Sequence, residues 1–143
     1  GLGKGDSFLM IEFTVFGDPK SKRISEAFFN PRTKKMVKFS PKSSKDWEQL
    51  VRAEAQRHRR DGCPWPDPTE MVLTFSFQRP KSSKREYPSV KPDLDKCVRA
   101  IFDALTGTFY NDDSQVVKII AHKVYGIPKV DISIGKIEDE TVP

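Results

Sequence analysis

Four aspartates bracket one predicted helix of this 143-residue chain and could together bind a metal ion. Asp93 and Asp95 stand at the start of the helix, within KPDLD, and Asp112 and Asp113 follow its end. No paired histidine or cysteine ligands accompany them, so the donors are hard carboxylate oxygens, which suit Mg²⁺ or Mn²⁺ rather than zinc. Such ions activate water and neutralise charge in phosphodiester hydrolysis. The residue types therefore predict a metal site for phosphate chemistry.

Convergence of these carboxylates depends on how the helix begins. If Asp93 is the N-cap, its side chain leaves the helical path and can approach that of Asp95. The loop with Asp112 and Asp113 can reach them if the strands before and after the helix are sheet neighbours. Each aspartate also has an ordinary structural explanation, as a capping residue, as a partner of the helix dipole, or in a surface ion-pair row with Arg99. Both interpretations stay open on these residues alone.

Apolar residues at helical spacing predict the helix that positions the aspartates. The pattern consists of Leu94, Cys97, Val98, Ile101, Phe102 and Leu105. Gly107 supplies a left-handed stop after it. Cys97 lies within this stripe, where a buried thiol is the expected role, and neither a disulfide with Cys63 nor a zinc site is assigned.

The remaining pattern predicts an α+β domain. Strands are expected over residues 8–17, 70–78, 114–126 and 128–135, and a hairpin is expected over residues 27–40. A helix is expected over residues 40–60, with an apolar side formed by Trp47, Leu50, Val51, Ala53 and Ala55. The order of these elements favours a mixed β-sheet with two main helices packed on one face.

Length and composition favour a single domain over residues 1–143. No apolar run approaches the roughly 18 residues that a membrane helix needs, so no membrane partner is expected. The N-terminal stretch does not show the long apolar segment of a signal peptide, and a cytoplasmic location is expected. Residues 136–143 are expected to form a frayed, solvated tail.

Positive charge is concentrated in the first part of the chain. Residues 1–91 contain 19 lysines and arginines against 11 acidic residues, a net charge of +8, whereas residues 92–143 have a net charge of −3. A basic chain that gathers its acidic residues in one region is expected to bind a polyanion around a metal site. Nucleic acid fits that description.

A long basic loop, residues 79–91, leads into the helix with the aspartates. We interpret it as a flexible arm that grips phosphates, with Tyr87 able to stack on an unpaired base. The alternative is a solvated loop whose lysines contact nothing. Basic residues of the 40–60 helix are further candidates for DNA contact, together with Lys20, Lys22, Arg23, Lys81, Lys84, Arg85, Tyr87, Lys91 and Lys96.

The stretch KPDLDKCVRAIFDALTGTFYNDDSQVV, followed by KVYG, resembles the signature of the RusA family of Holliday-junction resolvases. That signature reads approximately [KR]-P-D-[IL]-D-N-x-x-K, then D-A-L-x-G, then D-D-x-Q-V. A looser similarity extends from FTVFGDPKSKR to VDISI, over nearly the whole chain. The resemblance implies a RusA-like fold, a bacterial, phage or prophage origin, and a homodimeric, Mg²⁺-dependent endodeoxyribonuclease that cuts four-way DNA junctions symmetrically.

The resemblance also implies roles for individual residues. The metal-binding and catalytic aspartates match Asp93, Asp95 and Asp113, with Asp112 adjacent. Two positions depart from the family pattern: Lys96 replaces the asparagine, and Arg99 replaces the catalytic lysine. Because arginine stays protonated, Arg99 suits stabilisation of phosphoryl charge better than proton transfer. Lys96 could take over part of the work of the lysine.

Two rival functions remain open. One is a metal nuclease that acts on flaps, nicked duplex or RNA, which would use the same residues. The other is a non-catalytic or architectural protein that binds branched DNA, for which the basic loop suffices and the aspartates are caps.

Overall fold

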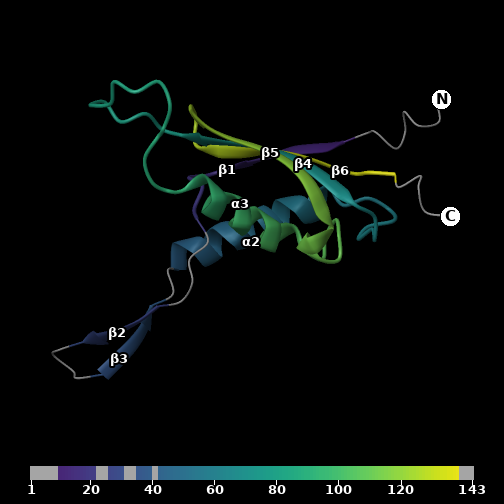
Figure 1. Cartoon of the computed structure of the whole chain (residues 1–143), viewed down its shortest axis with the longest axis horizontal. Coiled ribbons are helices and arrows are strands. Elements are labelled where there is room, and N and C mark those ends of the chain that lie inside the picture. The colour runs from purple at the N-terminus through teal and green to yellow at the C-terminus, as the bar shows by residue number, and fades with distance from the viewer. Residues whose placement is uncertain (1–9, 22–25, 31–34, 40–41, 139–143) are drawn as a thin grey trace.

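The computed structural model describes residues 10–21, 26–30, 35–39 and 42–138 (Figure 1). The predicted helices and strands are present in the predicted order, and a short 3-10 turn that was not predicted is added. They are β1 (Ile11–Phe16), β2 (Glu26–Asn30), β3 (Lys35–Phe39), α2 (Lys42–Arg57), β4 (Thr69–Phe77), α3 (Leu94–Leu105), the 3-10 turn η1 (Asp113–Gln115), β5 (Val116–Tyr125) and β6 (Lys129–Lys136). Lys22 and Arg23, two predicted DNA contacts, lie outside the described residues.

The main sheet is mixed, as predicted. Its four strands follow the order β1-β6-β4-β5. β4 and β5 are parallel, with Met71 opposite Ile119 and Phe75 opposite Lys123, whereas β6 pairs antiparallel with both β1 and β4. β5 is therefore an edge strand that follows β4 through a helical crossover.

Both long helices cover the same face of this sheet (Figure 1), so the predicted α+β arrangement is confirmed. Alternate residues of β1, β4 and β6 point toward the helices and are buried, which is the pattern of a sheet with one covered face. The centre of the core consists of Phe13, Met71, Leu73, Phe75, Ile132, Ile134, Val51, Ile101 and Leu105. Cys63 and Cys97 are both buried and free.

Two details of the predicted elements are wrong. In α2 the buried residues are Trp47, Val51 and Ala55, one turn apart, whereas Leu50 is 47% exposed and Ala53 is also exposed. The predicted frayed tail begins too early, because Lys136 belongs to β6 and the Ile137 amide donates to the Pro68 carbonyl at 2.7 Å. Residues 139–143 of that tail lie outside the described part of the chain.

β2 and β3 form the predicted hairpin, which lies apart from the main sheet in Figure 1. The hairpin is inserted between β1 and α2. At its base the Ser44 hydroxyl donates to the Ser21 carbonyl at 3.0 Å, so the outgoing and returning chain meet at one point. Among the described residues no helix is long and apolar enough to cross a membrane.

Candidate active site

The β4–α3–β5 crossover determines where the four aspartates lie. Because β4 and β5 are parallel neighbours, the chain must travel back along the sheet between them, and α3 makes this return. The loop before α3 and the turn after it therefore lie at opposite ends of the sheet. Asp93 and Asp95 belong to the first end, and Asp112 and Asp113 to the second.

Asp93 occupies the N-cap position of α3, as predicted, but it does not cap the helix. Its backbone is extended, and its side chain accepts no hydrogen bond from the first-turn amides. Its carboxylate instead lies 3.6 Å from the ammonium of Lys96. Asp95 follows in the first turn of α3, and both aspartates are exposed. The structure thus leaves two carboxylates accessible at the positive end of the helix.

Asp112, in contrast, is a structural cap. Its side chain accepts a hydrogen bond from the Ser114 amide at 3.2 Å, and the Gln115 side chain accepts one from the Asp112 amide at 2.8 Å. Together these bonds form a capping box around η1. The Gln115 amide group also donates to the carbonyls of Trp65 and Asp67, each at 2.9 Å. The turn that presents Asp113 is therefore fastened to the preceding loop.

Asp113 has an unusual electrostatic environment. Partial burial raises the pKa of its carboxyl, and the negative charges of Asp112 and Asp103 raise it further. The positive charge of Arg99 lowers the pKa of the same group. Arg99 is exposed and lies one turn before Asp103 on α3. Its positive charge therefore acts on the aspartates at the C-terminal end of this helix.

The two acidic ends do not meet within one chain. Residues 94–105 give α3 a length of about 18 Å. Lys123, seven residues after the start of β5, donates to the Pro92 carbonyl at 2.7 Å, whereas Asp113 lies three residues before the start of β5. In the part of the chain that the structure describes, no three acidic, histidine or cysteine side chains are close enough to hold one metal ion. The prediction of a single pocket formed by Asp93, Asp95 and Asp113 of one chain is therefore wrong.

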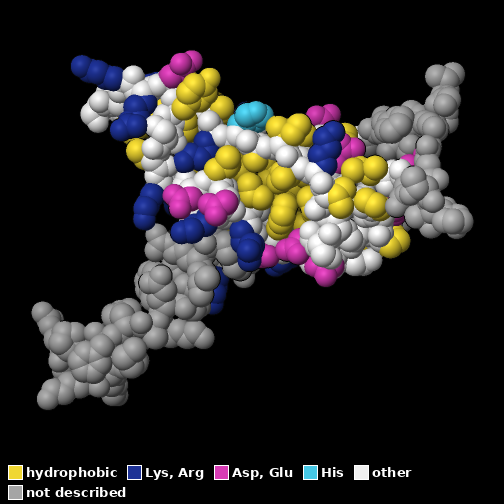
Figure 2. Space-filling view, viewed as in Figure 1, with side chains coloured by type: hydrophobic (Ala, Val, Ile, Leu, Met, Phe, Trp, Pro, Cys, Tyr) yellow, Lys and Arg dark blue, Asp and Glu magenta, His cyan; other side chains and the backbone are white. Residues whose placement is uncertain are grey.

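A strip of apolar side chains lies between the two acidic ends. Leu94, Val98 and Phe102, spaced by four residues along α3, are only partly buried. Val117 and Ile119 of the edge strand β5 are 65% and 38% exposed. Figure 2 shows this hydrophobic area over α3 and β5, with acidic side chains toward both ends of the helix. We call these five residues the α3–β5 strip.

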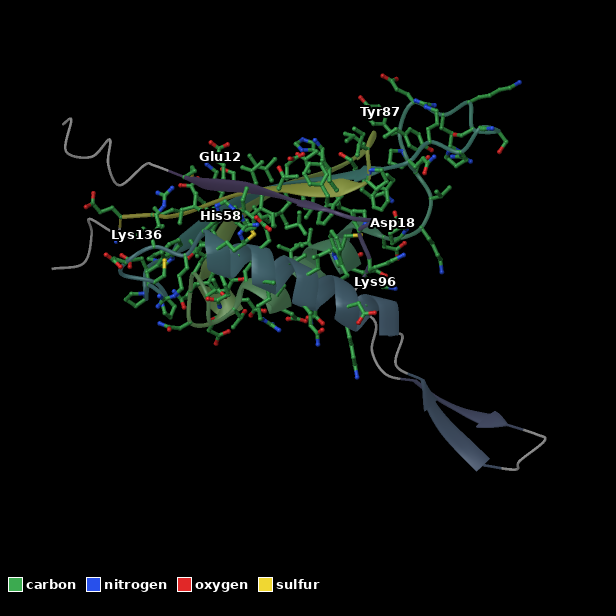
Figure 3. All side chains as sticks on the ribbon, turned by 180° about the vertical axis from the view of Figure 1, so that it is seen from behind. Glu12, Asp18, His58, Tyr87, Lys96 and Lys136 are labelled. Carbon is green, nitrogen blue, oxygen red and sulfur yellow. The ribbon has the colours of Figure 1, made fainter. Side chains whose placement is uncertain are left out.

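The predicted basic loop, residues 79–91, extends from the end of the sheet at which α3 begins (Figure 1). Lys81, Lys84, Arg85 and Lys91 are exposed, and Tyr87 is 59% exposed. Figure 3 shows Tyr87 in this loop and Lys96 at the same end of the molecule. Lys20 also lies in the described region, with its ammonium 3.4 Å from Asp18. The end with Asp93 and Asp95 is thus surrounded by cations and one accessible aromatic ring.

Two basic residues of the predicted 40–60 helix have structural partners that the sequence pattern did not indicate. Arg52 of α2 donates to the carbonyls of Asp103 and Ala104, at 2.8 and 3.2 Å, and so caps the C-terminus of α3. His58 stacks on Phe13 and lies 3.1 Å from Glu54. We therefore remove Arg52 and His58 from the candidates for DNA contact in this helix.

Sequence reasoning also missed Lys123. Its ammonium donates to the Val90 carbonyl at 2.6 Å and to the Pro92 carbonyl at 2.7 Å. The available signal was its position: along β5 the helix-facing residues Val117, Ile119 and Ala121 are apolar, and a lysine interrupts this face.

Comparison with known proteins relates this chain to a protein family and to a bacterial relative. Residues 25–135 match the family model described as "Endodeoxyribonuclease RusA". The chain is also 31% identical over 140 residues to "Uncharacterized protein YqaN" of Bacillus subtilis (strain 168), which covers 89% of this chain and 96% of that protein. The family match spans both acidic ends of α3, Arg99 and the basic loop.

Proposed function

Because this chain belongs to the RusA endodeoxyribonuclease family, we propose that it resolves four-way DNA junctions and similar branched DNA by cutting one phosphodiester bond in each of two strands. The family match carries this proposal, since it includes both acidic ends of α3. The geometry of Asp93 supports it. A carboxylate at an N-cap position that does not cap its helix is available for another partner.

We propose further that the active form is a homodimer in which the α3–β5 strips of two chains face each other. An exposed apolar area rimmed by charged residues is typical of an interaction surface, and a two-fold dimer uses the same surface on both chains. A two-fold axis across the middle of α3 reverses the direction of the helix in the second chain. Asp93 and Asp95 of one chain then lie against Asp113 of the partner subunit. Two equivalent sites result.

Such a composite site would hold Mg²⁺, or Mn²⁺, between the carboxylates of Asp93 and Asp95 and that of Asp113 of the partner subunit. The donor set fits, because hard divalent ions prefer carboxylate oxygens. When bound, the ion supplies activation of water and neutralisation of charge on the phosphate. The raised pKa of Asp113 fits a carboxyl that gains from a nearby cation.

Arg99 acts on the phosphate rather than on a proton. Its guanidinium is protonated at any working pH and can bind two phosphate oxygens at once. Its position between the two acidic ends places a positive charge where negative charge grows during hydrolysis. Lys96, next to Asp93, balances the acidic charge when DNA approaches.

The basic loop and its neighbours bind the DNA backbone. Exposed Lys81, Lys84, Arg85 and Lys91 provide phosphate contacts around the Asp93 end, and the exposed ring of Tyr87 provides a stacking surface. We therefore expect junction binding to weaken steeply as the salt concentration rises, measured by fluorescence anisotropy in EDTA. A flat response between low and moderate salt would contradict these phosphate contacts.

Replacement of single aspartates tests the proposed function. We expect Asp95→Asn and Asp113→Asn to abolish Mg²⁺-dependent cleavage of a four-way junction and to leave junction binding intact, because each variant removes a metal-binding charge with little change in shape. Asp61→Asn, at an exposed position after α2, is the matched control and should cleave like the wild type.

Three outcomes would redirect the proposal. Undiminished cleavage by Asp95→Asn would show that the carboxylate is not catalytic. Tight junction binding by the wild type without cleavage in Mg²⁺ or Mn²⁺ would favour a non-catalytic protein that binds branched DNA. Faster cleavage of flaps, nicked duplex or RNA than of the junction would favour a metal nuclease with another substrate.

A further inference from the structure

Lys123 connects the edge strand β5 to the backbone that leads into α3. Its ammonium donates to the Val90 carbonyl at 2.6 Å and to the Pro92 carbonyl at 2.7 Å. Both bonds have a charged donor and are short, which is typical of strong hydrogen bonds. Pro92 directly precedes Asp93, so these bonds fix the backbone immediately before Asp93.

Lys123 is a charged residue on the side of β5 that faces the helices. Lys123 lies opposite Phe75 in the parallel register, on the helix-facing side of the sheet, and Phe75 is fully buried. Lys123 itself is only partly buried, and its ammonium reaches the edge of the core, where hydrogen bonds replace part of its water. The two carbonyls do so, and the Phe77 ring lies 5.9 Å from the same ammonium.

Tyr125, two residues further along the same face of β5, holds the beginning of the same loop. The Arg79 guanidinium lies over its ring at 4.4 Å, and the hydroxyls of Ser83 and Tyr125 are 3.3 Å apart. Two consecutive helix-facing residues of β5 thus hold the basic loop, Tyr125 near its start and Lys123 at its end. The end that enters α3 depends on Lys123.

We propose that Lys123 is a positioning residue, which fixes the junction between the basic loop and α3 and thereby sets the direction of the Asp93 carboxylate toward a divalent cation. The inference rests on the proposed nuclease function, because it assigns Lys123 a role in the same site. Lys123 does not touch the reacting phosphate. It acts through the carbonyls of Val90 and Pro92.

Lys123→Met tests this role, with Lys123→Arg as the conservative variant. We expect Lys123→Met to lower kcat for junction cleavage and to raise the Mg²⁺ concentration needed for half-maximal rate, each by roughly 10- to 100-fold, the usual effect of removing an outer-shell partner. Junction affinity in EDTA should stay within about twofold, because the exposed cations of the loop are unchanged. Lys123→Arg should recover most of the rate, since a guanidinium can donate to the same carbonyls.

Limited trypsin digestion in EDTA provides a readout that does not depend on cleavage activity. We expect faster cutting after Lys84 and Arg85 in Lys123→Met than in the wild type, because the loop has lost one anchor. Lys118→Met is the matched control. It removes the same charge from the same strand, but its partner is Glu70, 3.8 Å away on the other side of the sheet. Its digestion, kcat and Mg²⁺ requirement should remain those of the wild type.

The outcomes separate the inference from the proposed function. If the wild type does not cleave junctions, the proposed function fails, while the digestion rates still decide whether Lys123 anchors the loop. If Lys123→Met keeps the wild-type Mg²⁺ requirement and kcat, the positioning role is refuted. The role is equally refuted if kcat and EDTA binding fall together with the melting temperature and Lys123→Arg restores none of them, since that pattern indicates a general loss of structure.

Discussion

The two ends of α3 carry aspartates that the fold treats differently. At the end of the helix, Asp112 belongs to a complete capping box, and Gln115 fastens the turn to Trp65 and Asp67. At the start, Asp93 stands at the N-cap without capping, and the backbone there is held by a lysine from β5 instead. The C-terminal end of α3 therefore leads into a hydrogen-bonded turn, whereas the N-terminal end leaves its two carboxylates accessible. The positions of the aspartates in the sequence do not by themselves distinguish a capping aspartate from an accessible one.

The largest expected effect comes from mixing chains that are defective at opposite ends. Asp95→Asn and Asp113→Asn homodimers should each be inactive. In a mixed dimer, however, one composite site combines an intact Asp95 from one chain with an intact Asp113 of the partner subunit. Random pairing should restore about a quarter of the wild-type sites. Junction nicking by the two variants, before and after they are mixed and allowed to exchange, measures this.

The mixing experiment has a matched control. A chain with both substitutions, mixed with Asp95→Asn, provides no intact composite site and should stay inactive. If the two single variants also remain inactive after verified exchange, then the ends of α3 do not meet across the dimer, and the composite site is disproved.

The next effect tests the surface between the two ends. Ile119→Asp places a charge in the α3–β5 strip, where two apolar faces would meet, and should convert the dimer into monomers and abolish cleavage. Light scattering measures the mass and a junction assay measures the rate. Ile127→Asp is the control, because Ile127 is 70% exposed but lies in the β5–β6 turn outside the strip. A dimeric, active Ile119→Asp protein would place the interface elsewhere.

A smaller effect separates the two ends by stability. Asp112→Ala removes a cap and should lower the free energy of unfolding by about 1 kcal/mol. Asp93→Ala removes no cap bond and should change stability much less, although it should abolish cleavage. Urea unfolding of both variants in EDTA gives the comparison. Equal losses of stability would mean that Asp93 contributes to the helix start in solution.

The smallest effect concerns pH. The pKa of Asp113 is raised in the folded chain, so its ionised form is less favourable there than in the unfolded chain. The stabilising contribution of the protonated Asp113 carboxyl is therefore fully present below the unfolded pKa, and it is lost as the pH rises through the folded pKa. Without metal, Asp113→Asn should be slightly more stable than the wild type at pH 7, and this difference should shrink as the pH falls toward about 4. Melting temperatures in EDTA measure it, and a difference that grows in acid would contradict the assignment.

Local patterns predicted the elements of this fold well, because each depends on residues that are close in sequence. The helix-spaced apolar residues of α3, its left-handed Gly107 and the alternation along β4 all appear where expected. The mixed sheet followed from the order of these elements. Leu50 shows the limit of predicting burial from hydrophobicity. It is hydrophobic, but it lies outside the face of α2 that contains the buried Trp47, Val51 and Ala55.

The site was harder to predict, because its geometry depends on strand neighbours. Because β4 and β5 pair in parallel, the turn after α3 lies at the end of the helix opposite Asp93. No short stretch of the sequence indicates this strand pairing. Lys123 was missed for a similar reason. Its acceptors, Val90 and Pro92, are more than 30 residues away in the chain, and only the folded sheet brings them to its side chain.

The hydrogen bond between Ser44 and Ser21 has a practical consequence for the β2–β3 hairpin. Since the chain leaves and re-enters the body at neighbouring points, a short glycine-serine bridge could replace residues 22–43 without pulling β1 away from α2. The truncated molecule would keep every catalytic candidate and the entire main sheet. It would thus test whether the main sheet and the two helices suffice for the proposed cleavage, and the excised segment could be exchanged between relatives to ask whether it selects among DNA shapes.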